Sequence, residues 1–291
     1  MTSSIYLDSN ATTQVMPQAL AAASLAMDAH FGNPSSTHSD GLVARDLLDQ
    51  ARQAAIQVLG AGNGDVMFNS GATEGIQTAV LSALCAIRER RADGLPIGNL
   101  LVYGATEHKA VPQALAHWNH ILGLGLEMRA LPVDASGRHD LHTLASWLPQ
   151  TAMLCTMAAN NETGVVTDLA AIGCLLRAVA DKPLWLVDGV QALGKLNMNL
   201  QASAIDYAVF SGHKLFAPKG VGILYVRRGA PFTPLMVGGG QEAGLRGGTE
   251  NMPGIAALGA VLQALLAGQG FASHATLCAW RDQLVRSLRQ A

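Results

Sequence analysis

Short apolar runs alternate with longer amphipathic stretches along most of this chain. Apolar runs of four to eight residues between turn residues predict buried strands, whereas apolar positions at every third or fourth residue predict helices. The strands expected are 5–8, 66–68, 100–103, 127–131, 152–157, 184–187, 207–210 and a run after the turn at 220–222. The helices expected are 17–27, 41–59, 75–90, 111–122, 168–180, an Ala- and Leu-rich helix after 251, and 279 to the end.

This alternation is typical of an α/β fold with a doubly wound sheet. In such sheets ligands bind outside the carboxyl ends of the strands. Polar residues follow several of the expected strands, so we predict one ligand site where these strand ends meet. The residues concerned are Thr73, His108, Asn161, Asp188, Gln191, Ser211, His213 and Lys214.

Lys214 ends the run Asp206–Lys214, beside small and polar neighbours. A lysine that is partly desolvated loses its proton more easily, and a neutral amine forms a Schiff base with an aldehyde. An ordinary surface lysine is the alternative, and it would be preferred for a lysine standing alone. The polar residues at the other strand ends favour the functional interpretation.

Two glycine-containing segments are candidates for anion binding. Ser70–Glu74 follows a strand and opens a helix, so its backbone N–H groups and the Thr73 hydroxyl would face an anion. An ordinary turn capped by Thr73 is the alternative. The segment 238–251 is either a flexible loop or a loop that brings Arg246 and Thr249 to an anion.

Other patterns are rejected. Gly60–Gly64 follows a helix and is interpreted as a C-cap and turn. Gly189–Lys195 fits the spacing of a nucleotide-binding loop, but Leu196 stands where Ser or Thr must hold magnesium. Two HxxH pairs, at 117–120 and 139–142, have no evident third ligand, so no metal site is predicted.

Composition narrows the class of protein. The 291 residues are 49% hydrophobic and 14% charged, with a net charge of −2, so neither nucleic acid nor an anionic membrane is expected as a partner. We find no apolar run long enough for a membrane span and no cleavable leader, which favours a cytoplasmic protein. The four cysteines are far apart, which argues against a disulfide framework. Low charge with 31 glycines favours large buried surfaces and a dimer.

Taken together, the motifs resemble those of the class V, fold-type I enzymes that use pyridoxal 5'-phosphate (PLP), and most closely the NifS/IscS-type cysteine desulfurases. The match runs in the family's order over nearly the whole chain. The motifs are Tyr6–Thr13, Phe31–Ser36, Ser70–Glu74, Thr106–His108, Asn160–Gly164, Val187–Gln191, Ser211–Lys214 and Arg246–Asn251.

The resemblance implies a role for each matching residue. Lys214 would hold PLP as a Schiff base and later move protons, and His108 would stack on the ring as a second catalytic residue. Asp188 would pair with the ring nitrogen. The remaining cofactor contacts would come from Ala72, Thr73, Ser211 and His213 at the phosphate, Asn161 and Gln191 at the ring oxygen, and Thr249 at the phosphate of a neighbouring subunit in a homodimer.

The resemblance also implies a domain organisation. A mainly parallel seven-stranded sheet with helices on both faces would form the PLP-binding large domain, residues 16–262. Residues 1–15 would contribute to a small domain, and 263–291 would begin its truncated C-terminal part. Family members continue beyond the position of Ala291 with a cysteine nucleophile and an arginine that binds the substrate carboxylate.

Three functions are consistent with these features. The first is a cysteine desulfurase that converts L-cysteine to L-alanine and passes sulfur to an acceptor or scaffold protein, here expected to be incomplete because the region of the cysteine nucleophile is absent. The second is a class V aminotransferase or lyase that needs no catalytic cysteine. The third is an inactive PLP-binding remnant or partner subunit.

Overall fold

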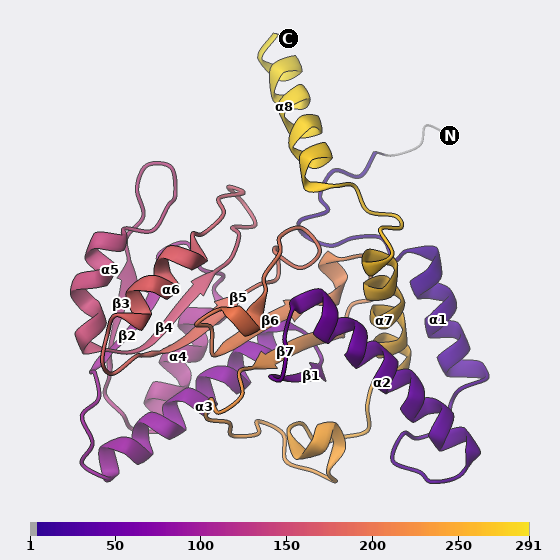
Figure 1. Ribbon diagram of the computed structural model, residues 1–291, viewed down its shortest axis with the longest axis horizontal. Coiled ribbons are helices and arrows are strands. Elements are labelled where there is room, and N and C mark those ends of the chain that lie inside the picture. The colour runs from indigo at the N-terminus through magenta and orange to yellow at the C-terminus, as the bar shows by residue number, and fades with distance from the viewer. Residues whose placement is uncertain (1–4, 291) are drawn as a thin grey trace.

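A seven-stranded sheet forms the centre of the computed structural model, which describes residues 5–290 (Figure 1). Residues 1–4 of the predicted N-terminal segment, and Ala291, lie outside the described residues. The strands are β1 Asp65–Asn69, β2 Leu100–Gly104, β3 Glu127–Leu131, β4 Thr151–Met157, β5 Leu184–Asp188, β6 Tyr207–Ser211 and β7 Gly222–Val226. The helices are α1 Pro17–Asp28, α2 Ser39–Leu59, α3 Ala72–Ala92, α4 Ala110–Ile121, α5 Leu141–Trp147, α6 Leu169–Arg177, α7 Met252–Leu266 and α8 His274–Gln290.

The strand order is β1-β7-β6-β5-β4-β2-β3. Strand β7 runs antiparallel to its neighbours β1 and β6, and the other neighbouring pairs are parallel. The prediction of a mainly parallel seven-stranded sheet is therefore confirmed. Because every strand except β7 runs in the same direction, the carboxyl ends of β1, β2, β4, β5 and β6 lie along one edge.

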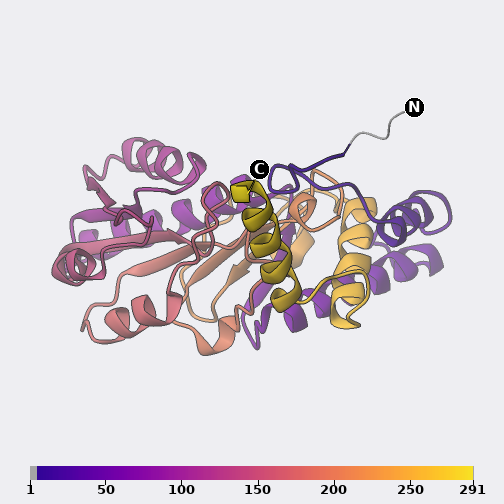
Figure 2. The same ribbon diagram turned by 90° about the horizontal axis from the view of Figure 1, so that it is seen from above.

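Helices cover both faces of the sheet, as predicted. One buried apolar cluster lies between the sheet and α3 and α4, and the other lies between the sheet and the remaining helices α1, α2, α5, α6 and α7. Alternate residues of β1 enter opposite clusters: Met67 joins the first, whereas Val66 and Phe68 join the second. Helices α1, α2 and α7 form one group at the right of Figures 1 and 2.

Some predicted elements differ from the observed ones. Residues 5–8 form no strand; Ile5 and Leu7 are 82% and 88% exposed, so the apolar pattern there does not reflect burial in the sheet. Helix α6 ends at Arg177 rather than near 180, and α8 begins at His274 rather than at 279. Helix α5 was not predicted, although Asp140 caps it by accepting hydrogen bonds from the N–H groups of His142 and Thr143.

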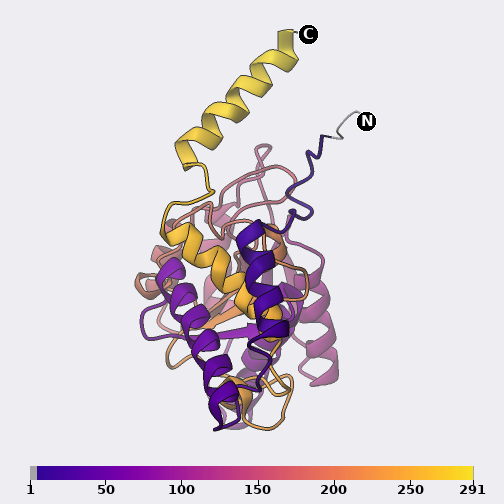
Figure 3. The same cartoon turned by 90° about the vertical axis from the view of Figure 1, so that its right-hand side faces the viewer.

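Helix α8 extends away from the rest of the molecule, on the side where the N-terminal segment also lies (Figures 1 and 3). None of its residues is buried. Among residues 5–290, no helix combines the length and apolarity that crossing a bilayer requires.

Candidate active site

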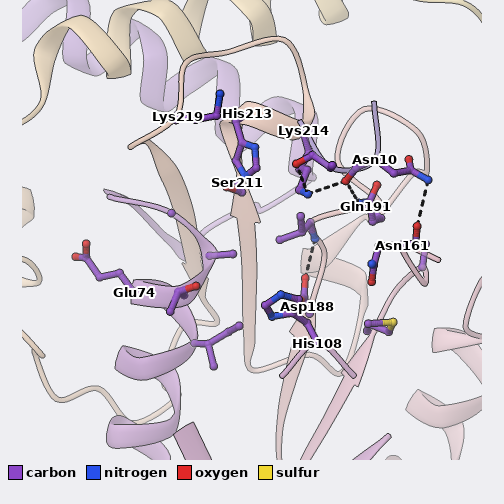
Figure 4. A pocket seen from close by; sticks show the side chains of 18 of the residues that line it. Asn10, Glu74, His108, Asn161, Asp188, Gln191, Ser211, His213, Lys214 and Lys219 are labelled. Atoms are coloured by element: carbon purple, nitrogen blue, oxygen red, sulfur yellow. Dashed lines mark hydrogen bonds between the residues drawn. The ribbon is translucent and has the colours of Figure 1, made fainter. Parts of the chain in front are cut away.

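A cavity of about 620 Å³ lies at the carboxyl ends of the parallel strands. Figure 4 shows the side chains that converge there from the strand ends and from the N-terminal segment. The structure brings nine of the ten predicted site residues into the cavity lining: Ala72, Thr73, His108, Asn161, Asp188, Gln191, Ser211, His213 and Lys214.

Lys214 is placed by a single turn of 3-10 helix, Gly212–Lys214, directly after β6. Its amine donates hydrogen bonds to the carbonyl oxygens of Asn10, at 2.6 Å, and Ala11, at 2.7 Å. Partial burial lowers the pKa of this amine, and the negative charges of Asp8 and Asp188 oppose that shift. Burial thus favours the neutral, nucleophilic form of the amine, as the sequence predicted for a desolvated lysine.

Asp188 ends β5 and is only 7% exposed. One carboxylate oxygen accepts a hydrogen bond from the Val190 N–H at 3.0 Å. Burial raises the pKa of the Asp188 carboxyl, and the positive charges of His108 and Lys214 oppose this shift. A protonated, cationic ring nitrogen at this position would offset the cost of burying the charged carboxylate.

His108 lies beside Asp188 in Figure 4. Its Nδ1 accepts a hydrogen bond from the Ala110 N–H at 3.2 Å, so this nitrogen carries no proton when the bond is made. A neutral imidazole therefore carries its proton on Nε2. The bond to the start of α4 fixes the ring at the wall of the cavity, where it can stack on a flat ligand.

The first turn of α3 forms the opposite end of the site. The helix begins at Ala72, directly after Gly71, so the first N–H groups have no partner within the helix and can bind an anion. This end of the cavity also has two hydroxyl groups, from Thr73 and Ser211, and the imidazole of His213. Burial lowers the pKa of His213, and the positive charges of Lys214 and Lys219 lower it further.

The N-terminal strap, defined here as residues 8–13, closes one side of the cavity. Thr13 donates from its N–H and its hydroxyl to the His213 carbonyl oxygen, both at 2.9 Å. The Asn10 amide donates to the Asn161 carbonyl oxygen at 3.2 Å. The sequence predicted no site role for Asp8 or Asn10, although the motif Tyr6–Thr13 that contains them was part of the resemblance.

Thr249 is the one predicted site residue outside this cavity. It lines a smaller adjoining hollow of about 200 Å³, which shares Ser70 and Gly220 with the main cavity. Arg246 does not present a free guanidinium to an anion, because it forms an ion pair with Glu74 at 2.9 Å. Anion binding by Arg246, one of the two interpretations of segment 238–251, stays a prediction; in this protomer Arg246 ties the loop to the first turn of α3.

Sequence reasoning missed two charged residues next to the site. Glu107 is almost fully buried, with one carboxyl oxygen accepting from the Met157 N–H at 2.5 Å. Its other oxygen, and the nearby Nε2 of His139, have no hydrogen-bond partner within residues 5–290. Lys195, rejected above as the lysine of a nucleotide-binding loop, donates to the Gln191 side chain at 2.8 Å. Its position one helical turn after Gln191 was the available signal.

The four cysteines do not form part of this cavity, and the structure shows no metal-binding cluster among the described residues. Cys85, Cys155, Cys174 and Cys278 are all absent from its lining. Burial raises the pKa of the Cys155 thiol well above its usual range, which opposes thiolate formation. Over the described part of the chain, no group of three or more His, Cys, Asp and Glu side chains could hold a metal ion.

The chemistry of the donor set fits one class of ligand. A desolvated amine can react with an aldehyde, a buried carboxylate can pair with a basic ring nitrogen, and a helix N-terminus with two hydroxyls can bind a phosphate. All three lie in one cavity between the strand ends and the N-terminal strap. The site can therefore hold a planar cofactor that carries an aldehyde, a ring nitrogen and a phosphate.

Comparison with known proteins gives consistent matches. The aminotransferase class-V family model matches residues 5–290. Cysteine desulfurase 2 of Trichormus variabilis is 44% identical over 256 residues, which are 88% of this chain and 61% of that protein. A cysteine desulfurase of Cereibacter sphaeroides is 38% identical over 287 residues, covering 98% of this chain and 70% of that protein.

Solved structures show the same fold. A NifS-like protein superposes with a TM-score of 0.83 at 33% identity, over 90% of this chain and 70% of its own. SspA in complex with cysteine gives a TM-score of 0.80 at 30% identity, over 89% of this chain and 72% of its own. The chain thus spans between about three fifths and three quarters of the length of the proteins it matches here.

Proposed function

Because this chain belongs to the aminotransferase class-V family, we propose that it binds PLP on Lys214 and acts on L-cysteine as a cysteine desulfurase. The observation that carries this proposal is the convergence in one cavity of the Lys214 amine, the buried Asp188 carboxyl and the free N-terminus of α3. When bound, PLP supplies an electron sink that stabilises negative charge developing on the substrate.

Each residue has a defined task in this proposal. Asp188 keeps the ring nitrogen protonated by placing a buried negative charge against it. His108 supports one face of the ring and carries a proton on Nε2 when its Nδ1 accepts from Ala110. Lys214 anchors the cofactor and, once displaced by substrate, is a base that can take a proton from the substrate and return it.

The anionic end of the cofactor has four matching donors. The N–H groups of Ala72 and Thr73 at the start of α3, together with Ser211 and His213, are proposed to hold the phosphate. Asn161 and Gln191 are proposed to contact the ring oxygen. Residues 16–262 would form the cofactor-binding unit, with 1–15 and 263–291 belonging to a second, smaller unit.

We further propose a homodimer in which Thr249 reaches the phosphate of the partner subunit. Its place in this protomer supports the proposal: Thr249 lines a hollow adjoining the cavity rather than the cavity itself. The loop that carries it is fastened by the Arg246–Glu74 ion pair and by a hydrogen bond from Asn251 to the Gly220 carbonyl oxygen at 3.0 Å. A loop held in this way can present its threonine outward at a defined position.

The overall reaction requires an acceptor for the sulfur atom that leaves L-cysteine. None of the four cysteines in this chain lines the cavity. The proposal therefore assigns the acceptor thiol to a group outside this set, on a sulfur-acceptor protein or on another polypeptide segment. A small thiol added in the assay can serve as the acceptor in its place.

The first test is an absorbance spectrum of the purified protein with PLP, before and after addition of L-cysteine. Wild type should develop the visible band of lysine-bound PLP, and L-cysteine should shift this band. Lys214→Ala should abolish the band, whereas Lys219→Ala, which removes an exposed lysine from the same cavity, should retain it. A band retained in Lys214→Ala would show that the cofactor is attached elsewhere.

The second candidate is a class V PLP enzyme of another reaction type, such as an aminotransferase or a lyase. The specific observation in its favour is that no cysteine of the chain lines the cavity. Product analysis separates the two candidates. L-Alanine formed together with thiol-bound sulfur supports the desulfurase, whereas a keto acid formed from the amino acid supports the alternative.

A further inference from the structure

Lys195 lies at the end of the turn that follows β5, in the segment whose spacing imitates a nucleotide-binding loop. The turn is compact: the N–H groups of Ala192 and Leu193 bond to the Gly189 carbonyl oxygen at 2.9 and 3.1 Å. Gly194 has a φ of +73°, and a Cβ there would lie 2.4 Å from a Leu215 methyl group. The glycine thus serves the tight turn, and the turn brings the lysine back over Gln191.

A chain of hydrogen bonds connects Lys195 with the cavity. The Lys195 amine donates to Oε1 of Gln191 at 2.8 Å, and Nε2 of Gln191 donates to the Asn10 carbonyl oxygen at 3.0 Å. The same Asn10 oxygen accepts from the Lys214 amine at 2.6 Å. Lys195 therefore acts on the cavity through Gln191, which is 7% exposed and lines the cavity, whereas Lys195 does not.

The charge of Lys195 decides which way the Gln191 amide points. An ammonium group can only donate hydrogen bonds, so the amide must turn its oxygen toward Lys195 and its N–H groups away from it. A neutral residue at position 195 would remove the donor from one side of the amide and leave only the Asn10 carbonyl oxygen to favour this orientation. With the lysine present, the N–H groups face Asn10 and the cavity.

The positive charge of Lys195 is not neutralised by an ion pair. Within residues 5–290, Lys195 forms no ion pair with a carboxylate. Burial lowers the pKa of the Lys195 amine, and the positive charge of Lys214 lowers it further. The other charged groups facing Lys214 are Asp8 from the N-terminal strap and Asp188 from the end of β5. In the turn after β6, His213 is next to Lys214 in the chain, and the positive charges of Lys214 and Lys219 both lower its pKa.

We propose that Lys195 is a positioning residue of the cofactor site, which holds the Gln191 amide with its N–H groups toward the cavity and keeps a positive charge behind it, close to Lys214. The inference rests on the proposed function. Its consequence is that an oxygen anion on the cofactor ring beside Gln191 meets the amide hydrogen that is not bonded to Asn10, backed by an ammonium charge. The same charge disfavours a proton on Lys214, both free and joined to the cofactor.

The test compares Lys195→Met, which removes the charge at similar length, with Lys195→Arg, which retains the charge and the donor. The first readout is the pH titration of the visible band of bound PLP, with affinity for PLP measured by absorbance titration. In Lys195→Met the midpoint should rise by about 1 unit and PLP should bind about tenfold more weakly. In Lys195→Arg the midpoint and the affinity for PLP should both stay near the wild-type values. Lys219→Met is the control, because it removes the charge of an exposed lysine that also lines the cavity.

The second readout needs no cofactor. Trace labelling with acetic anhydride at a series of pH values, followed by mass spectrometry of the Lys214 peptide, gives the titration midpoint of the free Lys214 amine. This midpoint should also rise by about 1 unit in Lys195→Met and stay near the wild-type value in Lys195→Arg. The labelling experiment decides the inference even if PLP is not the cofactor.

Each outcome has a separate meaning. An unchanged Lys214 midpoint in Lys195→Met would overturn the inference, because a merely structural lysine changes affinity without changing this titration. Equal shifts in Lys195→Met and Lys195→Arg would overturn it too, since the charge would then have no part. If wild type shows no lysine-dependent PLP band, the proposed function is contradicted instead. The role of Lys195 is then decided by the labelling experiment alone.

Discussion

The carboxyl groups of Glu107 and Asp188 lie close enough for the charge of one to affect the other. Asp188 lies near Lys214 and His108, which favour its charged form, and it lines the cavity. Glu107 has no such partner: one oxygen accepts from the Met157 N–H, and the other is buried without a partner in the described structure. Burial, with a smaller contribution from Asp188, raises the pKa of Glu107 well above its usual range. Burial thus disfavours the charged form of Glu107 more strongly than that of Asp188, which has neighbours that oppose the shift.

Replacing Glu107 by Gln should therefore change how stability depends on pH. The unfolded chain releases the Glu107 proton above about pH 4.3, whereas the folded chain keeps it until the raised pKa is reached. Wild type should lose stability as pH rises through this window, by up to about 1.4 kcal/mol per pH unit, and Glu107→Gln should be spared this loss.

Urea unfolding at pH 5 and pH 8 checks this expectation. The free energy of unfolding of Glu107→Gln, relative to wild type, should be higher at pH 8 than at pH 5. Glu89→Gln, on the exposed face of α3, is the matched control and should show the same difference from wild type at both values. A pH-independent difference for Glu107→Gln would mean that Glu107 is ionised in the folded protein.

The contrast between these two acids shows what the sequence can and cannot reveal about the site. Asp188 follows an apolar run directly, so its place at a strand end could be predicted. Glu107 also follows a strand, but its burial depends on Met157 of β4, some 50 positions further along the chain. Lys195 was missed for a different reason: its spacing from Gln191 was visible in the sequence, but the segment was considered only as a nucleotide-binding loop.

Strand β7 lies between β1 and β6 and brings two glycines into contact beneath the anion-binding end of the site. A Cβ on Gly222 would lie 2.6 Å from the Cα of Gly71 and 2.6 Å from the Phe210 carbonyl oxygen. Gly71 is the N-cap of α3. The absence of a side chain at position 222 therefore sets how closely the first turn of α3 approaches the sheet.

Gly222→Ala should force these backbone segments apart. We expect a loss of about 1–3 kcal/mol in the free energy of unfolding, together with weaker PLP binding, because the first turn of α3 moves with Gly71. Gly173→Ala in α6 is the control, since a Cβ there meets its neighbours at 3.5–3.8 Å. That variant should be neutral or gain up to about 1 kcal/mol. Equal effects in the two variants, by urea unfolding and PLP titration, would contradict this account.

At the scale of elements, apolar periodicity was a reliable guide where it reflected burial. Strand β4 is buried along its full length and was predicted nearly to its ends. The same kind of pattern was misleading at Ile5–Asp8, because an apolar run carries no information about whether a neighbouring strand is available to pair with it. The antiparallel direction of β7 was likewise not accessible, since the local pattern of a strand does not fix its direction.

At the scale of the molecule, the cavity is assembled from widely separated parts of the chain. The N-terminal strap, the start of α3, the ends of β4, β5 and β6, and the turn carrying Lys214 all contribute. Thr249 alone among the predicted site residues remains outside. In the proposed homodimer each site would take its lysine from one protomer and its threonine from the other.

Mixed dimers test this arrangement. Lys214→Ala chains purified alone should bind PLP without producing the visible band. Thr249→Ala chains purified alone should bind PLP with reduced affinity. A mixed dimer, isolated with a different affinity tag on each chain, would contain one intact site, built from Lys214 of one chain and Thr249 of the other.

The mixed dimer should therefore show wild-type PLP affinity at about half of its sites, measured by absorbance titration. If Thr249 serves the cavity of its own chain, no site in the mixed dimer is intact, and the affinity should remain at the level of Thr249→Ala. A protein that remains monomeric at micromolar concentration would contradict the shared site directly.

Lys214 bonds to the carbonyl oxygens of Asn10 and Ala11, which precede it by 204 and 203 positions. A ribosome that adds 5–20 residues per second needs about 10 to 40 s to pass from the strap to the lysine. Throughout that interval the residues of the strap have no finished site to close. Binding of a cofactor is thus a late event in the synthesis of this protein. Until the turn that carries Lys214 has been made, the N-terminal strap stays unpaired and accessible to chaperones.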